Sequence, residues 1–107
     1  MQPLGPFQEI WDAWGEVDKE VKAHSVADFR QIIEVQIDEM AEHLANGDRK
    51  RAAYEVVDII SVALTMMRWL DLRPTEIATL AEQRAHDRMK GQVVEIMRRY
   101  RASFRLR

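Results

Sequence analysis

Apolar residues recur through most of this chain at the three- and four-residue spacing of amphipathic helices. The first such run consists of Phe7, Ile10, Trp11, Trp14, Val17 and Val21. Residues spaced in this way lie on one face of a helix, so the run predicts a helix in the first fifth of the chain. His24 and Ser25 interrupt the pattern and mark the end of this helix.

Two longer helices are predicted next, joined by a tight turn. Ser25 followed by Asp28 resembles a capping box, which favours a helix over residues 26–45 with an apolar stripe. The expected core stripe consists of Phe29, Ile33, Ile37, Met40 and Leu44. Asn46-Gly47 is typical of a helix stop, and Asp48 is a suitable N-cap for a third helix over about residues 49–70. So short a connection favours antiparallel neighbours.

The rest of the chain predicts further helices and no strand. Pro74 is suited to the first turn of a fourth helix, Gly91 breaks or bends it, and residues 93–104 form a last amphipathic stretch. We therefore expect one all-α domain over residues 1–107, with four to five helices in a bundle. The third helix is apolar on almost every side, and one chain of 107 residues buries too little to enclose it. Homo-oligomerisation is expected to complete the bundle.

Composition limits the kinds of bond, metal site and cellular location that we expect for the protein. The chain has no cysteine, which excludes disulfides and thiolate metal sites. It shows no signal peptide and no apolar run long enough to span a membrane, so we expect a cytoplasmic protein without a membrane partner. The net charge of −2 is uneven, because residues 84–107 hold eight Lys or Arg against Asp87 and Glu95. This basic end is either a solvated tail or a surface for phosphate or a partner subunit.

The most informative chemistry lies on the third helix. Among residues 52–67 only Glu55 and Asp58 are charged, and a spacing of three places both on one side of the helix. Two carboxylates in an apolar setting repel each other and lose solvation, so they need protons, cationic partners or a metal ion. The second helix offers a matching stripe that begins with Ile32 and Val35 and ends in acidic residues, Glu39 and Glu42.

The antiparallel turn brings these two acidic pairs within a few helical turns of each other. Four or five oxygen donors in one place suit a hard cation such as Mg²⁺ or Mn²⁺ better than Zn²⁺. For the second helix alone, ordinary surface charges that pair with Lys or Arg are the favoured interpretation of Glu39 and Glu42. The two pairs together favour metal.

Two acidic motifs carry a resemblance to a known family. They are Asp38-Glu39-Met40-Ala41-Glu42 and, after twelve intervening residues, Glu55-Val56-Val57-Asp58. Together they resemble the EExxE…ExxD signature of MazG-like nucleotide pyrophosphohydrolases. This all-α superfamily also contains dimeric dUTPases and phosphoribosyl-ATP pyrophosphohydrolases. The resemblance covers about residues 26–72 and departs from the family pattern at Asp38, where the family usually has Glu.

The resemblance implies an Mg²⁺-dependent hydrolase, with Mn²⁺ as a possible substitute. Such an enzyme cleaves a nucleoside triphosphate between its α and β phosphates, releasing a monophosphate and pyrophosphate. The implied catalytic and metal-binding residues are Glu39, Glu42, Glu55 and Asp58. One of these carboxylates, or Asp38, accepts a proton from the attacking water. The resemblance also implies a homodimer or homotetramer.

Phosphate-binding and base-binding residues are harder to assign from the sequence. Arg84 and Arg88 share one helix face at i, i+4 and Lys90 follows, so these three are candidate substrate-binding cations, although each is equally compatible with a solvated surface. Tryptophans can stack on a base, but large aromatic residues at helical spacing are usually core. On that basis Trp11, Trp14 and Trp69 are expected in the core.

Three alternatives remain. One is a phosphoribosyl-ATP pyrophosphohydrolase, although its further motifs are not recognised after Asp58. Another is a non-catalytic helical oligomer that binds nucleotide or a protein partner. The third is nucleic-acid binding through the arginine-rich end, which lacks the interleaved aromatic residues of such surfaces.

Overall fold

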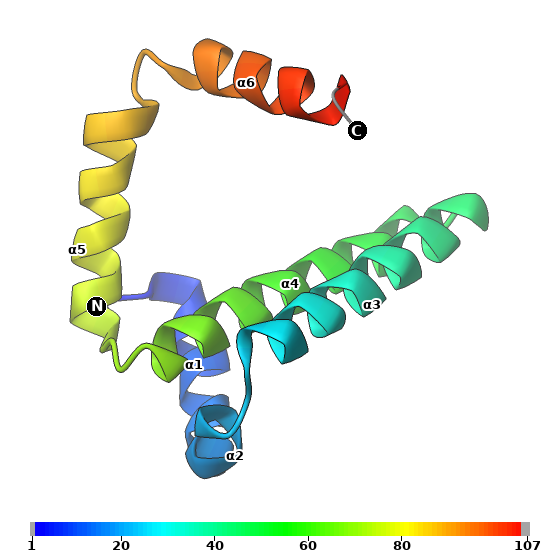
Figure 1. Ribbon diagram of the computed structural model, residues 1–107. Helices are drawn as coiled ribbons and strands as arrows, with labels where there is room; N and C mark the ends of the chain where they lie inside the picture. Colours follow the sequence, from blue (N-terminus) through cyan, green and yellow to red (C-terminus); the bar gives the residue numbers. More distant parts are fainter. Residues whose placement is uncertain (1, 106–107) are drawn as a thin grey trace.

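The computed structural model describes residues 2–105 (Figure 1), and within that range the chain forms helices and no strand. In chain order the α-helices are α1 (Gln8–Trp14), α2 (Asp18–Lys22), α3 (Val26–Ala45), α4 (Arg49–Trp69), α5 (Pro74–Arg84) and α6 (Val93–Arg105). Short helical turns η1 (Gly5–Phe7) and η2 (Gly15–Val17) flank α1, and a π-helical turn η3 (Ala85–Met89) follows α5. The predicted all-α class is confirmed.

The antiparallel hairpin of α3 and α4 is the centre of the structure (Figure 1). Its ends are set by the predicted caps. The Ser25 hydroxyl accepts from the backbone N–H of Asp28 at 3.2 Å, and the Asp28 carboxylate accepts from the N–H of Ser25 at 2.8 Å. Asp48 accepts from the N–H of Arg51 at 2.9 Å, which opens α4. Gly47 turns the chain with φ +74°, a conformation that favours glycine.

The face that α3 turns toward α4 differs from the predicted stripe. Phe29 is buried and Ile33 and Met40 are half-buried, as expected, but Ile37 and Leu44 are 43% and 46% exposed. Gln36 and His43 take the inward positions instead. Helical periodicity allows either Ile37 and Leu44 or Gln36 and His43 to face inward. In the packed hairpin it is Gln36 and His43 that lie toward α4.

Helices α1 and α2 pack across the base of the hairpin, near the end of α4. The Arg68 guanidinium lies 3.9 Å from the centre of the Trp11 ring and donates to the Trp11 carbonyl. Lys22 pairs with Asp71 and donates to the Arg68 carbonyl at the end of α4, where a cation is favourable. The Trp69 indole donates to the His24 carbonyl at 2.9 Å. These contacts fix the N-terminal segment to the hairpin.

The three tryptophans divide between core and surface. Trp11 is buried and Trp69 is half-buried, but Trp14 is 40% exposed. The core expectation is therefore wrong for Trp14, whose indole N–H donates to the Ser61 hydroxyl at 2.8 Å on the surface of α4.

Helices α5 and α6 leave the hairpin as an arm (Figure 1). Pro74 begins α5, and the N–H of Arg73 donates to Glu76 at 3.1 Å. Gly91, with φ +78°, separates η3 from α6 as the sequence predicts. Within this one chain the arm does not close a bundle, and Tyr54, Val56 and Val57 of α4 each stay more than 40% exposed. No helix within residues 2–105 combines the length and apolar character needed to cross a membrane.

The base of the hairpin depends on Phe29, which is 2% exposed and packs edge-on against His24 and Trp69. Phe29→Ala removes a ring from a packed site, and the free energy of unfolding should fall by about 3–5 kcal/mol. Val26→Ala, one turn earlier on α3 and 61% exposed, should change it by less than about 0.5 kcal/mol. Urea denaturation measures both, and similar losses in the two variants would contradict this description of the core.

Candidate metal centre

Three carboxylates gather on one side of the hairpin, in the half nearer the turn. Glu39 comes from α3 and Glu55 and Asp58 come from α4, and these three residues are called the acidic cluster below. Glu55 is the innermost, with a side chain only 13% exposed. The carboxyl groups of Glu39 and Glu55 lie close enough to share a hydrogen bond when one of them holds a proton.

Glu55 has an unusual electrostatic setting for a helix surface. Burial raises its pKa above the ordinary value of 4.5, and the neighbouring charges of Glu39 and Asp58 raise it further. His43 opposes this shift: its Nε2 lies 3.5 Å from Glu55 Oε1 and lowers the pKa of Glu55. The second oxygen, Oε2, is buried and has no hydrogen-bond partner within residues 2–105. A carboxylate in this position requires a proton or a cation.

Within residues 2–105, no arginine or lysine forms an ion pair with the acidic cluster. Among the described residues, the ion pairs of Lys and Arg go to other acids, namely Asp18, Asp48, Asp71 and Glu95. Among the described residues, Glu39 therefore has no ion pair with a lysine or arginine, which was the alternative interpretation of this residue. The cluster keeps an excess of negative charge that a hard cation could balance.

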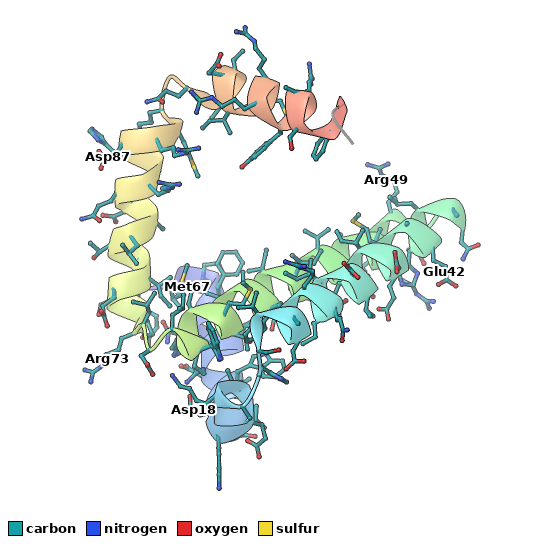
Figure 2. All side chains as sticks on the ribbon, viewed as in Figure 1. Asp18, Glu42, Arg49, Met67, Arg73 and Asp87 are labelled. Carbon is teal, nitrogen blue, oxygen red and sulfur yellow. The ribbon has the colours of Figure 1, made fainter. Side chains whose placement is uncertain are left out.

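The carboxylates of the acidic cluster are not close enough together to form a complete metal site. Across residues 2–105, no three His, Asp or Glu side chains come close enough to ligate one ion. Glu42, the remaining predicted ligand, is exposed near the turn, and Figure 2 shows its side chain extending outward from α3. Asp38 is also exposed on α3. The structure thus brings together three of the four predicted carboxylates and leaves Glu42 outside the group.

The predicted phosphate-binding cations lie in a different region. Arg84 ends α5, Arg88 lies in η3 and Lys90 follows it, so all three belong to the arm rather than to the hairpin. Glu55 is fourteen residues before the end of α4, a separation of about 21 Å along the helix, and the arm begins beyond that end. Within a single chain the three cations do not meet the acidic cluster.

Two neighbours of the acidic cluster were not predicted from the sequence as site residues. His43 is four residues after Glu39 and therefore shares its helix side, a spacing that could have suggested it. Trp14 reaches the cluster's border through Ser61, which lies three residues after Asp58 on the same side of α4. No spacing within the sequence predicts that Trp14 contacts Ser61, because this contact depends on how α1 crosses α4.

Comparison of the chain with protein-family models, with curated proteins and with solved structures gives no match. The assignment of the site therefore rests on the geometry and chemistry of the chain itself.

The raised pKa of Glu55 predicts a pH-dependent stability in metal-free protein. A carboxyl group whose pKa is higher in the folded state than in the unfolded state stabilises the fold below the unfolded pKa, and this contribution is lost as the pH rises through the folded pKa. Glu55→Gln should therefore melt a few degrees higher than wild type at pH 7 in EDTA. The difference in melting temperature between Glu55→Gln and wild type should vanish below about pH 4.5, the ordinary pKa of a glutamate.

Thermal melts followed by circular dichroism across this pH range measure the difference. Glu34→Gln, on an exposed position of α3, is the matched control and should follow wild type throughout. A Glu55→Gln variant that is less stable than wild type at neutral pH would show that the carboxylate is not strained in the folded chain.

Proposed function

We propose that this protein is an Mg²⁺-dependent nucleoside triphosphate pyrophosphohydrolase that converts an NTP or dNTP into the monophosphate and pyrophosphate. The observation that carries the proposal is the convergence of Glu39, Glu55 and Asp58 from two helices without an arginine or lysine partner in the described chain. The spacing of these acids, which resembles the MazG-like signature, supports the same activity.

The residues present fit a hard divalent cation. The acidic cluster offers only oxygen donors, and one buried oxygen of Glu55 lacks a hydrogen-bond partner in the described chain. Glu39, Glu55 and Asp58 are the proposed ligands. Glu42 is a fourth, reached by rotation of an exposed side chain on the next turn of α3. A bound Mg²⁺ neutralises phosphate oxygens and lowers the pKa of a coordinated water.

The chain's own groups have distinct proposed tasks. One of the carboxylates of the acidic cluster, or Asp38, is the candidate proton acceptor for the attacking water. His43, beside Glu55, holds that carboxyl group in place. The exposed Trp14 borders the site and offers an aromatic face against which a base could stack.

The proposed enzyme is a homodimer or homotetramer, because α3 and α4 leave apolar side chains uncovered on the side opposite the acidic cluster. Ile37 and Leu44 of α3 and Val56 of α4 are each more than 40% exposed. Helical spacing places them together on one side of the antiparallel pair. A second copy covering this side leaves the acidic side open to substrate.

Incubation with a panel of NTPs and dNTPs in Mg²⁺ or Mn²⁺ tests the activity, with monophosphate and pyrophosphate as the measured products. Wild-type protein should release both in equal amounts and none in EDTA. Glu55→Gln and Asp58→Asn should reduce turnover to background, since a neutral isostere ligates metal poorly while keeping the fold. Circular dichroism establishes that the variants are folded.

Glu34→Gln is the control variant, because Glu34 lies about 140° around α3 from Glu39. It should retain wild-type turnover. Wild-type rates in both site variants would refute the assignment of the site. A folded wild-type protein that binds nucleotide without releasing pyrophosphate would favour a non-catalytic helical oligomer.

A further inference from the structure

The described chain exposes more surface than a compact protein of its size. Scaling with mass gives about 6,200 Å² for a compact monomer, whereas this 12.6 kDa chain exposes 8562 Å². Its radius of gyration is 15.9 Å, against about 13 Å for a compact domain of the same length. The excess of about 2,400 Å² is comparable to what each subunit buries in a large obligate dimer.

Much of the exposed apolar surface lies on α6. Val93, Met97 and Tyr100 follow each other at i, i+4 and i+7 and therefore form one stripe on this helix. They are 59%, 51% and 56% exposed. A helix of thirteen residues is only marginally stable in water without a packing surface. The stripe thus needs a partner surface for α6 to be helical.

The chain's own hairpin does not supply that surface. The helical segment from Pro74 to Met89, about 24 Å long at the usual rise per residue, lies between the base of the hairpin and the start of α6. Packed helices lie only about 8–10 Å apart. Figure 1 shows α6 turning back over the hairpin with open space between them.

The surface of α4 that faces this space is largely apolar. Figure 2 shows Arg49 and Met67 on the side of α4 toward the arm. Val56 and Ile60 lie between them on the same helix face, at positions seven and eleven residues after Arg49. Val56 is 43% exposed and Ile60 is half-buried. This face is called the arm-facing stripe of α4 below.

We propose that two copies of this chain exchange their arms, so that α6 of each copy packs its apolar stripe on the arm-facing stripe of α4 in the other. A second copy is the fitting occupant for two reasons. The uncovered area matches what a large obligate dimer buries, and each copy carries both complementary stripes. The proposal concerns assembly and is independent of the proposed catalysis.

Cross-linking between two single-cysteine variants tests the exchange, and the natural absence of cysteine makes every cross-link assignable. Met97→Cys labels α6 and Val56→Cys labels α4. When the two variants are mixed, unfolded, refolded together and treated with a short bismaleimide, peptide mass spectrometry should find position 97 joined to position 56. That link can form only between different chains. Arg99→Cys, on the opposite side of α6, is the matched control and should give little of it.

A protein carrying both Met97→Cys and Val56→Cys separates exchange from folding back. A cross-linked dimer is the expected product, whereas an internal cross-link within a monomer would overturn the exchange. Absence of any link between positions 97 and 56 would also overturn it.

Light scattering on uncross-linked protein provides the second measurement. Wild type should have twice the 12.6 kDa mass of one chain. Met97→Glu should shift it toward monomer, while Arg99→Gln, an equal charge change on the opposite side of α6, should remain dimeric. A wild-type monomer at micromolar concentration would contradict the proposal, and so would a Met97→Glu variant that is folded and fully dimeric.

Discussion

The structure depends on the contact between α3 and α4, and this contact surrounds a carboxylate that is unfavourable for folding. Glu55 lies between two helices with its side chain 13% exposed, next to Glu39 and Asp58, and among the described residues the side chain that pairs with it is His43. Desolvation and like charge both disfavour the ionised form. A chain that used this position only for packing would be more stable with an apolar or amide side chain there. Such a locally unfavourable arrangement is typical of a site that binds a ligand.

The two sides of the hairpin differ in chemistry, which suits the two proposed tasks of binding a ligand and binding a partner helix. One side carries the acidic cluster and, at its border, the exposed Trp14. The other carries exposed aliphatic residues, including Ile37 and Val56. A ligand rich in phosphate and a helical partner can therefore bind without competing for the same surface. The N-terminal segment supports this division, because its contacts through Arg68 and Trp69 are confined to the base of the hairpin.

Local signals in the sequence were sufficient for the boundaries of α3 and α4 and insufficient for the rotation of each helix. They also predicted a single N-terminal helix where the structure has α1, η2 and α2. The Ser25 cap, Gly47 and Pro74 act on neighbouring backbone, so the elements that they bound were predicted almost to the residue. Which side of α3 faces inward depends on the packing of α4, and this placed His43 inside and Ile37 outside. The same rotation explains the site, since Glu39 meets Glu55 while Glu42, almost a turn later, faces solvent. The direction of the arm depends on tertiary contacts that no short spacing encodes.

Arm exchange has a consequence for the site itself. If α6 covers the apolar side of another copy's α4, then folding and association are one process, and stability increases with protein concentration. The covered hairpin is also held more rigidly than a pair of helices exposed on both sides. The proposed metal site would need carboxylates from both α3 and α4, and within residues 2–105 of the single chain no group of three lies close enough to hold an ion. A partner helix on the opposite side of the same hairpin would restrict the movement of α3 relative to α4, which would connect the proposed assembly with the proposed metal site.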